Sequence, residues 1–135
     1  QRLTRLLELQ QPFAFALADL DGFKEINDTH SHVCGNEILK QFSRLFAKAG
    51  HPDGDLFRYG GDEFCLLTSS PESLSRVLKR WEQIPLTCSW EGENLNIGFS
   101  IGVLYYDGKE KQSFEAIISE ADRRMYASKM KRRSS

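Results

Sequence analysis

Two short acidic stretches hold the side chains best suited to chemistry. Residues 58–64 read RYGGDEF, in which Asp62 and Glu63 follow two glycines, and a second stretch, ADLDG, carries Asp19 and Asp21. Carboxylates this close repel one another unless a cation lies between them, and Mg²⁺ takes such oxygen ligands while leaving positions for substrate phosphates. Two such ions about 4 Å apart can activate a hydroxyl and stabilise charge that develops on a phosphate. If the stretches meet in space, they favour phosphoryl or nucleotidyl transfer.

The expected secondary structure would bring the two stretches together. The run FAFALA (13–18) after Pro12 is typical of a buried central strand that ends at Asp19. LFRY and EFCLLT flank the glycines and are expected to form a hairpin, because Gly-Gly supplies the positive φ angles of a tight two-residue turn. A strand beside this hairpin would gather the four carboxylates at one sheet edge. A solvated hairpin tip and an unrelated polar strand end would give the same spacing, so spacing alone leaves both interpretations open.

The rest of the chain alternates helices and strands. Apolar spacing predicts helices over 1–10, FKEINDTHS, 36–50 and 71–85, and a last helix that Ser113 caps. TCSW and LNIGFSIGVLYY are expected to form a second hairpin around EGEN. Because two strand pairs are hairpins within an interleaved order, the sequence predicts an α+β, sandwich-like domain. Its central sheet should be mixed, mainly antiparallel and five-stranded, with helices flanking it.

Length and composition narrow the classes of function. At 135 residues and 40% hydrophobic content, the chain suits one compact domain spanning 1–135. Lys and Arg (18) nearly balance Asp and Glu (19), which argues against a broad basic face for nucleic acid. The longest apolar run is too short to cross a bilayer, and no charged-then-apolar leader opens the chain. We therefore expect a soluble segment that binds neither nucleic acid nor membrane.

The cysteines and the first helix bear on the setting of the domain. Cys34, Cys65 and Cys88 lie in apolar contexts without metal-type spacing, so buried, unreactive thiols in a reducing cytoplasm are expected. His30 and His32 have no partners at zinc-like spacing. The first predicted helix has no cap or turn residue before it, which favours a domain excised from a larger signalling protein. Membrane anchoring of that parent protein stays an open alternative.

Several longer motifs match a known family in the right order. They are DLDGFKEIND (19–28) followed by SHVCGN, the signature GGDEF (60–64) after Arg58 and Tyr59, FSIGV (99–103), and ADRRMYASKMKRR (121–133). On these motifs the chain, from about residue 13 to 133, resembles the GGDEF family of diguanylate cyclases. The resemblance implies a palm-like nucleotide-cyclase fold and bacterial second-messenger signalling. Two domains, each with one GTP, would pair transiently as a homodimer, and each 3′-hydroxyl would attack the other α-phosphate to give cyclic di-GMP and two pyrophosphates.

The resemblance also implies roles for residues of the two acidic stretches. Asp19 and Glu63 would hold Mg²⁺, or Mn²⁺ in its place, with help from the Leu20 carbonyl. Asp62 would be a further metal ligand or the base for the 3′-hydroxyl. In the signature, GG (60–61) would keep side chains away, so that backbone can approach the nucleotide.

Four further residues are implied to bind the phosphates. Phe23 and Lys24 open a predicted helix, whose free N–H groups suit an anion. Lys129 and Arg133 would add positive charge to the same triphosphate, although basic residues in a last helical turn commonly compensate the helix dipole instead. Arg132 stands before Arg133 where the family has glycine, so the end of this helix is expected to differ.

The base-reading pair is the most informative departure from the family. Asn27 matches the guanine-contacting Asn of the family, with a hydrogen bond to helix-end backbone as its ordinary alternative. The second reader is Asp in the family and Asn36 here. An amide has one accepting and one donating end, so it cannot accept from both guanine N1–H and N2–H₂. Losing a buried partner costs roughly 1–3 kcal/mol, so we expect weaker guanine binding and less discrimination against ATP, with GTP still favoured.

Other departures concern regulation and the walls of the pocket. The family's R-x-x-D feedback site aligns with His51 and Gly54, so both charges are missing and feedback by product through that surface is not expected. Ser31 replaces a glycine, and a side chain there resists positive φ. The family segment D-x-LTGL-x-NR is missing or truncated, and LTRLL resembles it only weakly, so the sequence does not identify the residues that form the outer wall of the nucleotide pocket.

Three functions are therefore compatible with the sequence. An active diguanylate cyclase is favoured by the intact signature, the metal-ligand positions and Lys129. Asn36 and the lost feedback site favour a second function, in which a weak or inactive domain acts as a receptor for GTP or cyclic di-GMP. Asn36 alone suggests a third function, a relaxed-specificity synthase of cyclic dinucleotides.

Overall fold

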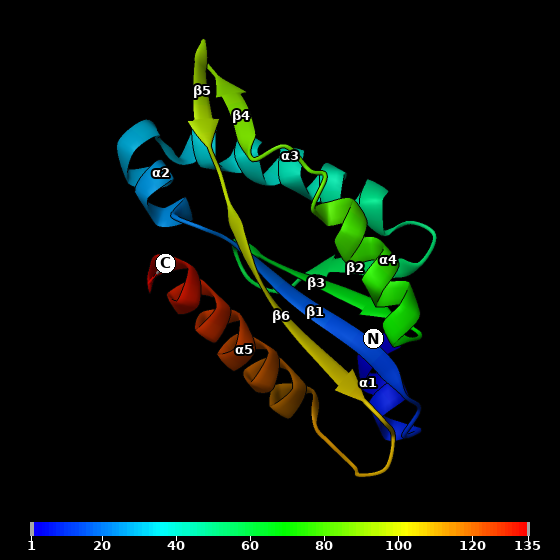
Figure 1. The fold of residues 1–135 in the computed structure, drawn as a ribbon. Coiled ribbons are helices and arrows are strands. Elements are labelled where there is room, and N and C mark those ends of the chain that lie inside the picture. Colours follow the sequence, from blue (N-terminus) through cyan, green and yellow to red (C-terminus); the bar gives the residue numbers. More distant parts are fainter. Residues whose placement is uncertain (1, 135) are drawn as a thin grey trace.

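A four-stranded antiparallel sheet forms the centre of the molecule (Figure 1). The structure, a computed structural model, describes residues 2–134 and the side chains of residues 2–131. Strand β1 (Phe13–Leu20) lies between β3 (Glu63–Thr68) and β6 (Phe99–Tyr106), and β2 (Gly54–Arg58) pairs with the other side of β3. All residues from 13 to 18 are buried, which confirms FAFALA as the buried central strand. The α+β class and the antiparallel hairpin at the signature are confirmed as well.

The second predicted hairpin differs from the sequence expectation. Strands β4 (Thr87–Trp90) and β5 (Glu93–Asn96) pair only with each other, so the sheet has four strands and is not mixed. Glu91 and Gly92 make the turn with positive φ angles of 47° and 81°, which allows a tight hairpin. The chain leaves β5 at Ile97, whose fully buried side chain joins the core and whose N–H donates to the Leu86 carbonyl at 2.7 Å. This anchor interrupts the single long strand expected over 95–106.

The described residues form five helices (Figure 1). They are α1 (Arg2–Glu8), α2 (Phe23–His30), α3 (His32–Gly50), α4 (Pro71–Trp81) and α5 (Phe114–Ser134). Helix α2 packs on α3, and the others lie against the faces of the sheet. The alternation of β1 divides the core. The alanines at 14, 16 and 18 face α3 and α4, whereas Phe13, Phe15 and Leu17 face α1 and α5. None of the helices described is long and apolar enough to cross a membrane.

Bulky side chains fill the space that the alanines of β1 leave on the α3 and α4 face. Phe46 of α3 is fully buried, and its ring centroid lies 4.6 Å from Trp81, 5.0 Å from Phe99 and 5.3 Å from Phe64. Each such ring stabilises the fold by roughly 1.5–3 kcal/mol through burial. Phe64 belongs to the signature and Phe99 to β6. Their contacts with Phe46 therefore attach the signature strand and β6 to the core.

Side-chain caps set several helix boundaries. Ser113 accepts from Ala116 N at 3.1 Å and caps α5, as predicted. Ser70 caps α4 in the same way, and this helix ends at Trp81 instead of reaching 85. Helix α3 begins at His32, four residues before the prediction, because Ser31 accepts from Cys34 N at 3.2 Å. Strand β2 begins at Gly54, inside a segment that was expected to be loop.

Candidate active site

The two acidic stretches meet at one end of the sheet. In the antiparallel register of β1 and β3, Asp19 lies directly opposite Glu63. The Leu20 N–H donates to the carbonyl of Asp62 at 3.4 Å, so the backbone of the signature loop also touches the end of β1. The predicted juxtaposition of the two stretches is confirmed. It follows from the sheet order, in which β1 and β3 are neighbours.

The signature loop has a different conformation from the expected tight turn. Residues 59–62 connect β2 to β3, and the Tyr59 N–H donates to the Glu63 carbonyl at 3.1 Å. Neither glycine of the loop has a positive φ, so the predicted two-residue Gly-Gly turn is wrong. A Cβ on Gly60 would lie 3.1 Å from Glu63 Oε1, whereas one on Gly61 would meet no described atom within 4 Å. The first glycine makes room for Glu63, and the second leaves open space above the loop.

Two side chains brace this loop from the protein side. The guanidinium of Arg58 donates to the Gly61 carbonyl and lies 6.0 Å from the centroid of the Phe64 ring. The ring of Tyr59 lies 5.9 Å from that of Phe114, the first residue of α5. These contacts hold the loop without the positive φ angles of a glycine turn.

Lys129 reaches the acidic cluster from helix α5. Its Nζ lies 3.4 Å from Asp19 Oδ2 and 3.7 Å from Asp21 Oδ1. The approach depends on Gly102 of β6, because a Cβ there would overlap the Ala121 carbonyl and lie 2.6 Å from Met125 N. Gly102 is the glycine of the FSIGV motif, and nothing in the sequence alone pointed to this packing role. The helix rests directly on the strand, and its last turns extend toward the carboxylates.

Asp19 is the most perturbed carboxyl group of the cluster. Its Oδ1 is buried and has no hydrogen-bond partner. Burial, a hydrogen bond with Asp62 and repulsion from Asp62 raise the pKa of Asp19 from 3.8 to about 7, and Lys129 opposes this rise. Burial also raises the pKa of Glu63, with smaller contributions from Asp122 and Asp62. Both groups would be stabilised by more positive charge than the protein itself provides.

Helices α2 and α3 place the two predicted base-reading residues. A Cβ on Gly35 would overlap the Asn27 side-chain oxygen and lie 3.1 Å from Phe23 Cζ, so Asn27 packs on the glycine that precedes Asn36. Asn36 is exposed beside it. The structure thus brings Asn27 and Asn36 to neighbouring positions, and it adds Gly35, which sequence reasoning did not single out.

Ser31 separates these two helices in a strained conformation. Its φ of 135° and ψ of 166° belong to a region that is essentially restricted to glycine, as expected from the glycine that it replaces.

The other predicted phosphate ligands, Phe23, Lys24 and Arg133, have fewer described polar contacts than Lys129. Phe23 begins α2 after Gly22, which has a φ of 68° and no capping side chain, and Lys24 is exposed. The side chain of Arg133 lies outside the described part of the structure.

Comparison with known proteins decides the family. All 135 residues match the family model described as "Diguanylate cyclase, GGDEF domain". The chain belongs to the GGDEF family. "Diguanylate cyclase DosC" of Shigella sonnei is 36% identical in an alignment 129 residues long, which covers 91% of this chain and 27% of the relative. "Diguanylate cyclase A" of Treponema denticola is 29% identical in an alignment 133 residues long, which covers 94% of this chain and 35% of that protein.

Solved structures agree on the fold. The GGDEF domain of YfiN from Pseudomonas aeruginosa superposes with a TM-score of 0.81 at 26% identity, covering 96% of this chain and 86% of that one. The GGDEF domain of DgcB from Caulobacter crescentus, solved in complex with cyclic di-GMP, gives a TM-score of 0.73 at 24% identity, covering 95% and 78%. The palm-like fold expected from the resemblance is therefore confirmed. The domain spans about a quarter of the length of the DosC relatives that it matches.

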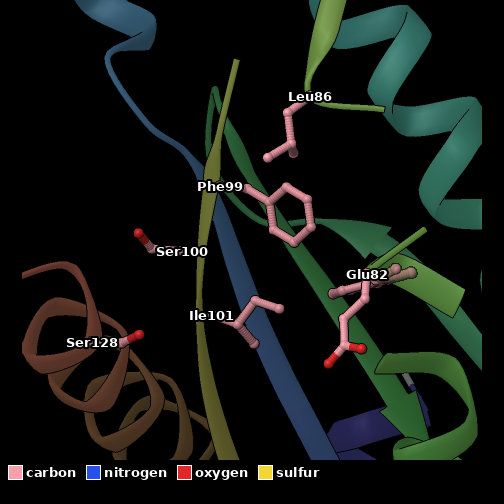
Figure 2. A pocket seen from close by; sticks show the side chains of 7 residues that line it. Glu82, Leu86, Phe99, Ser100, Ile101 and Ser128 are labelled. Carbon is pink, nitrogen blue, oxygen red and sulfur yellow. The ribbon is translucent and has the colours of Figure 1, made fainter. Parts of the chain in front are cut away.

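A pocket lies at strand β6 of this GGDEF domain, and Ser100 and Ser128 are among the residues that line it (Figure 2). Phe99 and Ile101 point into the pocket, of about 280 Å³, together with Glu82 and Leu86. Ser100 points to the opposite side of β6, toward α5. Its Oγ donates to Asp21 Oδ1 at 2.7 Å, a contact of the acidic cluster that sequence reasoning missed.

The carboxylates of the GGDEF domain fit a divalent cation. Mg²⁺ is usually bound through one or two carboxylates plus waters and substrate phosphates, and it needs no complete cage of protein ligands. No group of three or more His, Cys, Asp or Glu among the described residues is arranged to hold a metal by itself. The partnerless buried oxygen of Asp19 is the observation that favours a cation, because a buried carboxylate oxygen without a partner is costly.

Proposed function

We propose that this GGDEF domain is an active diguanylate cyclase, which condenses two GTP molecules into cyclic di-GMP. The observation that carries the proposal is the convergence of Asp19, Glu63 and Lys129 from three separate elements at the signature loop. Two close carboxylates and one ammonium suit a site for a divalent cation and a nucleoside triphosphate. Membership of the family and the names of the relatives support the same activity.

The reaction joins two nucleotides by two equivalent steps. The 3′-hydroxyl oxygen of one GTP bonds to the α-phosphorus of the other, and the bond from that phosphorus to the bridging oxygen of the leaving pyrophosphate breaks. The hydroxyl proton is lost to a nearby base, and Asp62 is suited to this role by its place in the signature loop. Repeating the step in the opposite direction closes the ring. Each step releases one pyrophosphate, so two are formed for each cyclic di-GMP.

Residues of both strand ends would hold the metal. Asp19 and Glu63, the Leu20 carbonyl and, as an alternative to its role as base, Asp62 are the proposed ligands for Mg²⁺ or Mn²⁺. When bound, the metal would lower the pKa of the attacking hydroxyl and neutralise charge on the phosphates. The raised pKa of Asp19 supports this assignment, because a cation beside the carboxylate would remove the cost of ionising it.

The positive groups around the carboxylates would bind the triphosphate. Lys129 lies within reach of the cluster, and the first N–H groups of α2 at Phe23 and Lys24 are not capped by a side chain. Such N–H groups favour anions. Arg133 is proposed to add a further charge. GG (60–61) would let the nucleotide approach backbone, in agreement with the open space above Gly61.

Catalysis requires two copies of the domain, because one domain is proposed to hold only one GTP. We propose a transient homodimer in which the two nucleotides face each other. Product is proposed to bind in the same pocket, so that cyclic di-GMP competes with GTP.

Feedback through a separate surface is not expected. At the position of the R-x-x-D site the chain has His51 and Gly54, and the intervening Asp53 forms ion pairs with Arg76 and Arg80 of helix α4. Both arginines therefore already pair with a carboxylate of their own chain. Inhibition by cyclic di-GMP should therefore be competitive with GTP, and noncompetitive inhibition would contradict this part of the proposal.

Turnover with separated nucleotides tests the proposed function. The domain at high concentration is incubated with Mg²⁺ and GTP, ATP or both, and the products are separated by chromatography, with Glu63→Gln as the blank. Cyclic di-GMP from the parent and none from the blank is expected. Absence of product from proven dimers that bind GTP with metal would favour a receptor for GTP or cyclic di-GMP. Mixed guanine–adenine products would identify a relaxed-specificity synthase, as the exposed Asn36 allows.

A further inference from the structure

The ammonium of Lys129 lies where the acidic cluster needs positive charge. It is 3.4 Å from Asp19 Oδ2 and 3.7 Å from Asp21 Oδ1. The exposed fractions of the three side chains are only 22%, 17% and 23%. Charges shielded to this degree attract each other more strongly than a pair at an open surface. The nucleotide-free cluster therefore already contains a cation that its own chain supplies.

Asp21 is aligned for its contact with this lysine. Its Oδ1, the oxygen that faces Nζ, accepts a hydrogen bond from Ser100 Oγ at 2.7 Å. Its backbone N–H donates to the Gly98 carbonyl at 2.9 Å. Ser100 belongs to β6, the strand on which α5 rests, and Figure 2 shows its hydroxyl on the α5 side of that strand. The strand thus fixes the carboxylate relative to the helix that carries the ammonium.

The ammonium only partly satisfies Asp19. It approaches Oδ2, while Oδ1 stays buried without a partner. A divalent cation bound by Asp19 would lie close to the present position of Nζ, and two cations repel each other strongly in a shielded site. The ammonium of a lysine is carried on a flexible side chain, so it can move away from Asp19 if another anion binds it instead. A triphosphate would be such an anion.

We propose that Lys129 is the resident counter-cation of the nucleotide-free domain and competes with the divalent metal for Asp19. Asp21, aligned by Ser100, is the positioning residue that keeps the ammonium there. The inference rests on the proposed function, because it takes the triphosphate as the group to which Lys129 moves when metal enters. Metal alone should bind weakly, and metal together with nucleotide should bind tightly.

Binding of Mn²⁺ alone, measured by calorimetry on the nucleotide-free domain, tests the competition. Lys129→Met is expected to bind Mn²⁺ about tenfold more tightly than the parent, because a like charge next to the site is removed. Lys79→Met, which removes the same charge from an exposed position on α4, should match the parent within about twofold. Ser100→Ala keeps every charge but removes the hydrogen bond that aligns Asp21, and its Mn²⁺ affinity should lie between those of the parent and Lys129→Met.

For nucleotide binding, the order of affinity of the parent and Lys129→Met should be the reverse of that for Mn²⁺. With saturating Mn²⁺ and a GTP analogue whose α and β phosphorus atoms are joined by a methylene group, Lys129→Met should bind the analogue more weakly than the parent. Tighter Mn²⁺ binding together with weaker nucleotide binding is not expected from a purely structural lysine. Thermal unfolding of each variant establishes that it is folded during these measurements.

Several outcomes would overturn the inference. One is that Lys129→Met binds Mn²⁺ no more tightly than the parent. Another is that Lys79→Met gains as much Mn²⁺ affinity as Lys129→Met. If Asp19→Asn binds Mn²⁺ like the parent, the metal is not at Asp19, and both the competition and the proposed metal ligands fail. If the Mn²⁺ affinities follow the expected order but the parent makes no product, the competition stands and the proposed cyclase activity alone fails.

Discussion

Asn36 is the residue at which the choice of base can be changed most simply. Its amide cannot accept from both guanine donors, whereas a carboxylate can. Asn36→Asp should therefore tighten GTP binding and raise the preference for GTP over ATP by about tenfold, in line with roughly 1–3 kcal/mol for one restored hydrogen bond. Equilibrium binding of both nucleotides with metal checks this. The same GTP affinity and the same GTP/ATP ratio in parent and variant would rule out Asn36 as a reader of the base.

Asp19 makes the stability of the metal-free domain depend on pH. Its pKa is about 7 in the folded state, against 3.8 ordinarily. Between pH 3.8 and about 7 the folded state therefore holds a proton on Asp19 that the unfolded state has lost. The free energy of unfolding is highest below about pH 4, and the contribution of Asp19 to it is lost as the pH rises through 7. In chelator, Asp19→Asn should be more stable than the parent at pH 8, by about 2–4 kcal/mol, and the difference should shrink toward pH 4.

Urea unfolding across this pH range measures the effect, and the exposed Asp28→Asn is the control. This variant removes one negative charge from an exposed position and so measures the effect of charge loss alone. A constant offset between Asp19→Asn and the parent would mean that Asp19 ionises normally in the folded domain.

The contact between α5 and β6 delivers Lys129 to the site. A Cβ on Gly102 would overlap the Ala121 carbonyl, so Gly102→Ala must push helix and strand apart. Gly102→Ala should lower the unfolding free energy by about 1–3 kcal/mol and reduce turnover further, because Lys129 moves with the helix. Gly61→Ala is the matched control, since its Cβ would meet no described atom within 4 Å. Urea unfolding should find it within about 0.5 kcal/mol of the parent. Equal stability of the two variants would contradict this account of Gly102.

Elements with strong local signals could be predicted from the sequence. The continuous apolar run of β1 indicated a central strand, and Ser113 with the apolar spacing after it indicated α5. The errors lie where tertiary contacts overrode local preference. Ile97 is buried in the core and breaks the long strand, and Ser31 starts α3 early from a backbone conformation that its type disfavours. Gly-Gly suggested a tight turn, but Arg58 braces a longer loop instead.

At the scale of the whole molecule, the site is assembled from distant parts of the sequence. Motif resemblance was sufficient to name Asp19, Glu63 and Lys129, and the sheet order explains why the first two are neighbours. Ser100 and Gly102 were not found, because a serine or glycine in a strand carries no chemical signal until the packed helix is known. The described part of one domain brings Asp19, Glu63 and Lys129 together once, at the end of β1 and β3.

The proposed homodimer makes a distinctive prediction for mixtures of parent and Glu63→Gln. In a mixed pair, only the metal site of the parent can promote attack on the nucleotide that it holds. That attack joins the two nucleotides once and releases one pyrophosphate, but the second, ring-closing attack would need the impaired site. Adding excess Glu63→Gln to the parent should therefore suppress cyclic di-GMP and cause the linear dinucleotide to accumulate.

Chromatography of the two products over a range of mixing ratios measures this, and bovine serum albumin in place of the variant controls for dilution. The parent alone should also show a specific activity that rises with protein concentration, because two domains must meet. If cyclic di-GMP were unaffected by excess Glu63→Gln and specific activity did not depend on concentration, both steps would occur within one domain. That result would require two nucleotide sites in a chain that brings together only one set of Asp19, Glu63 and Lys129 in its described part.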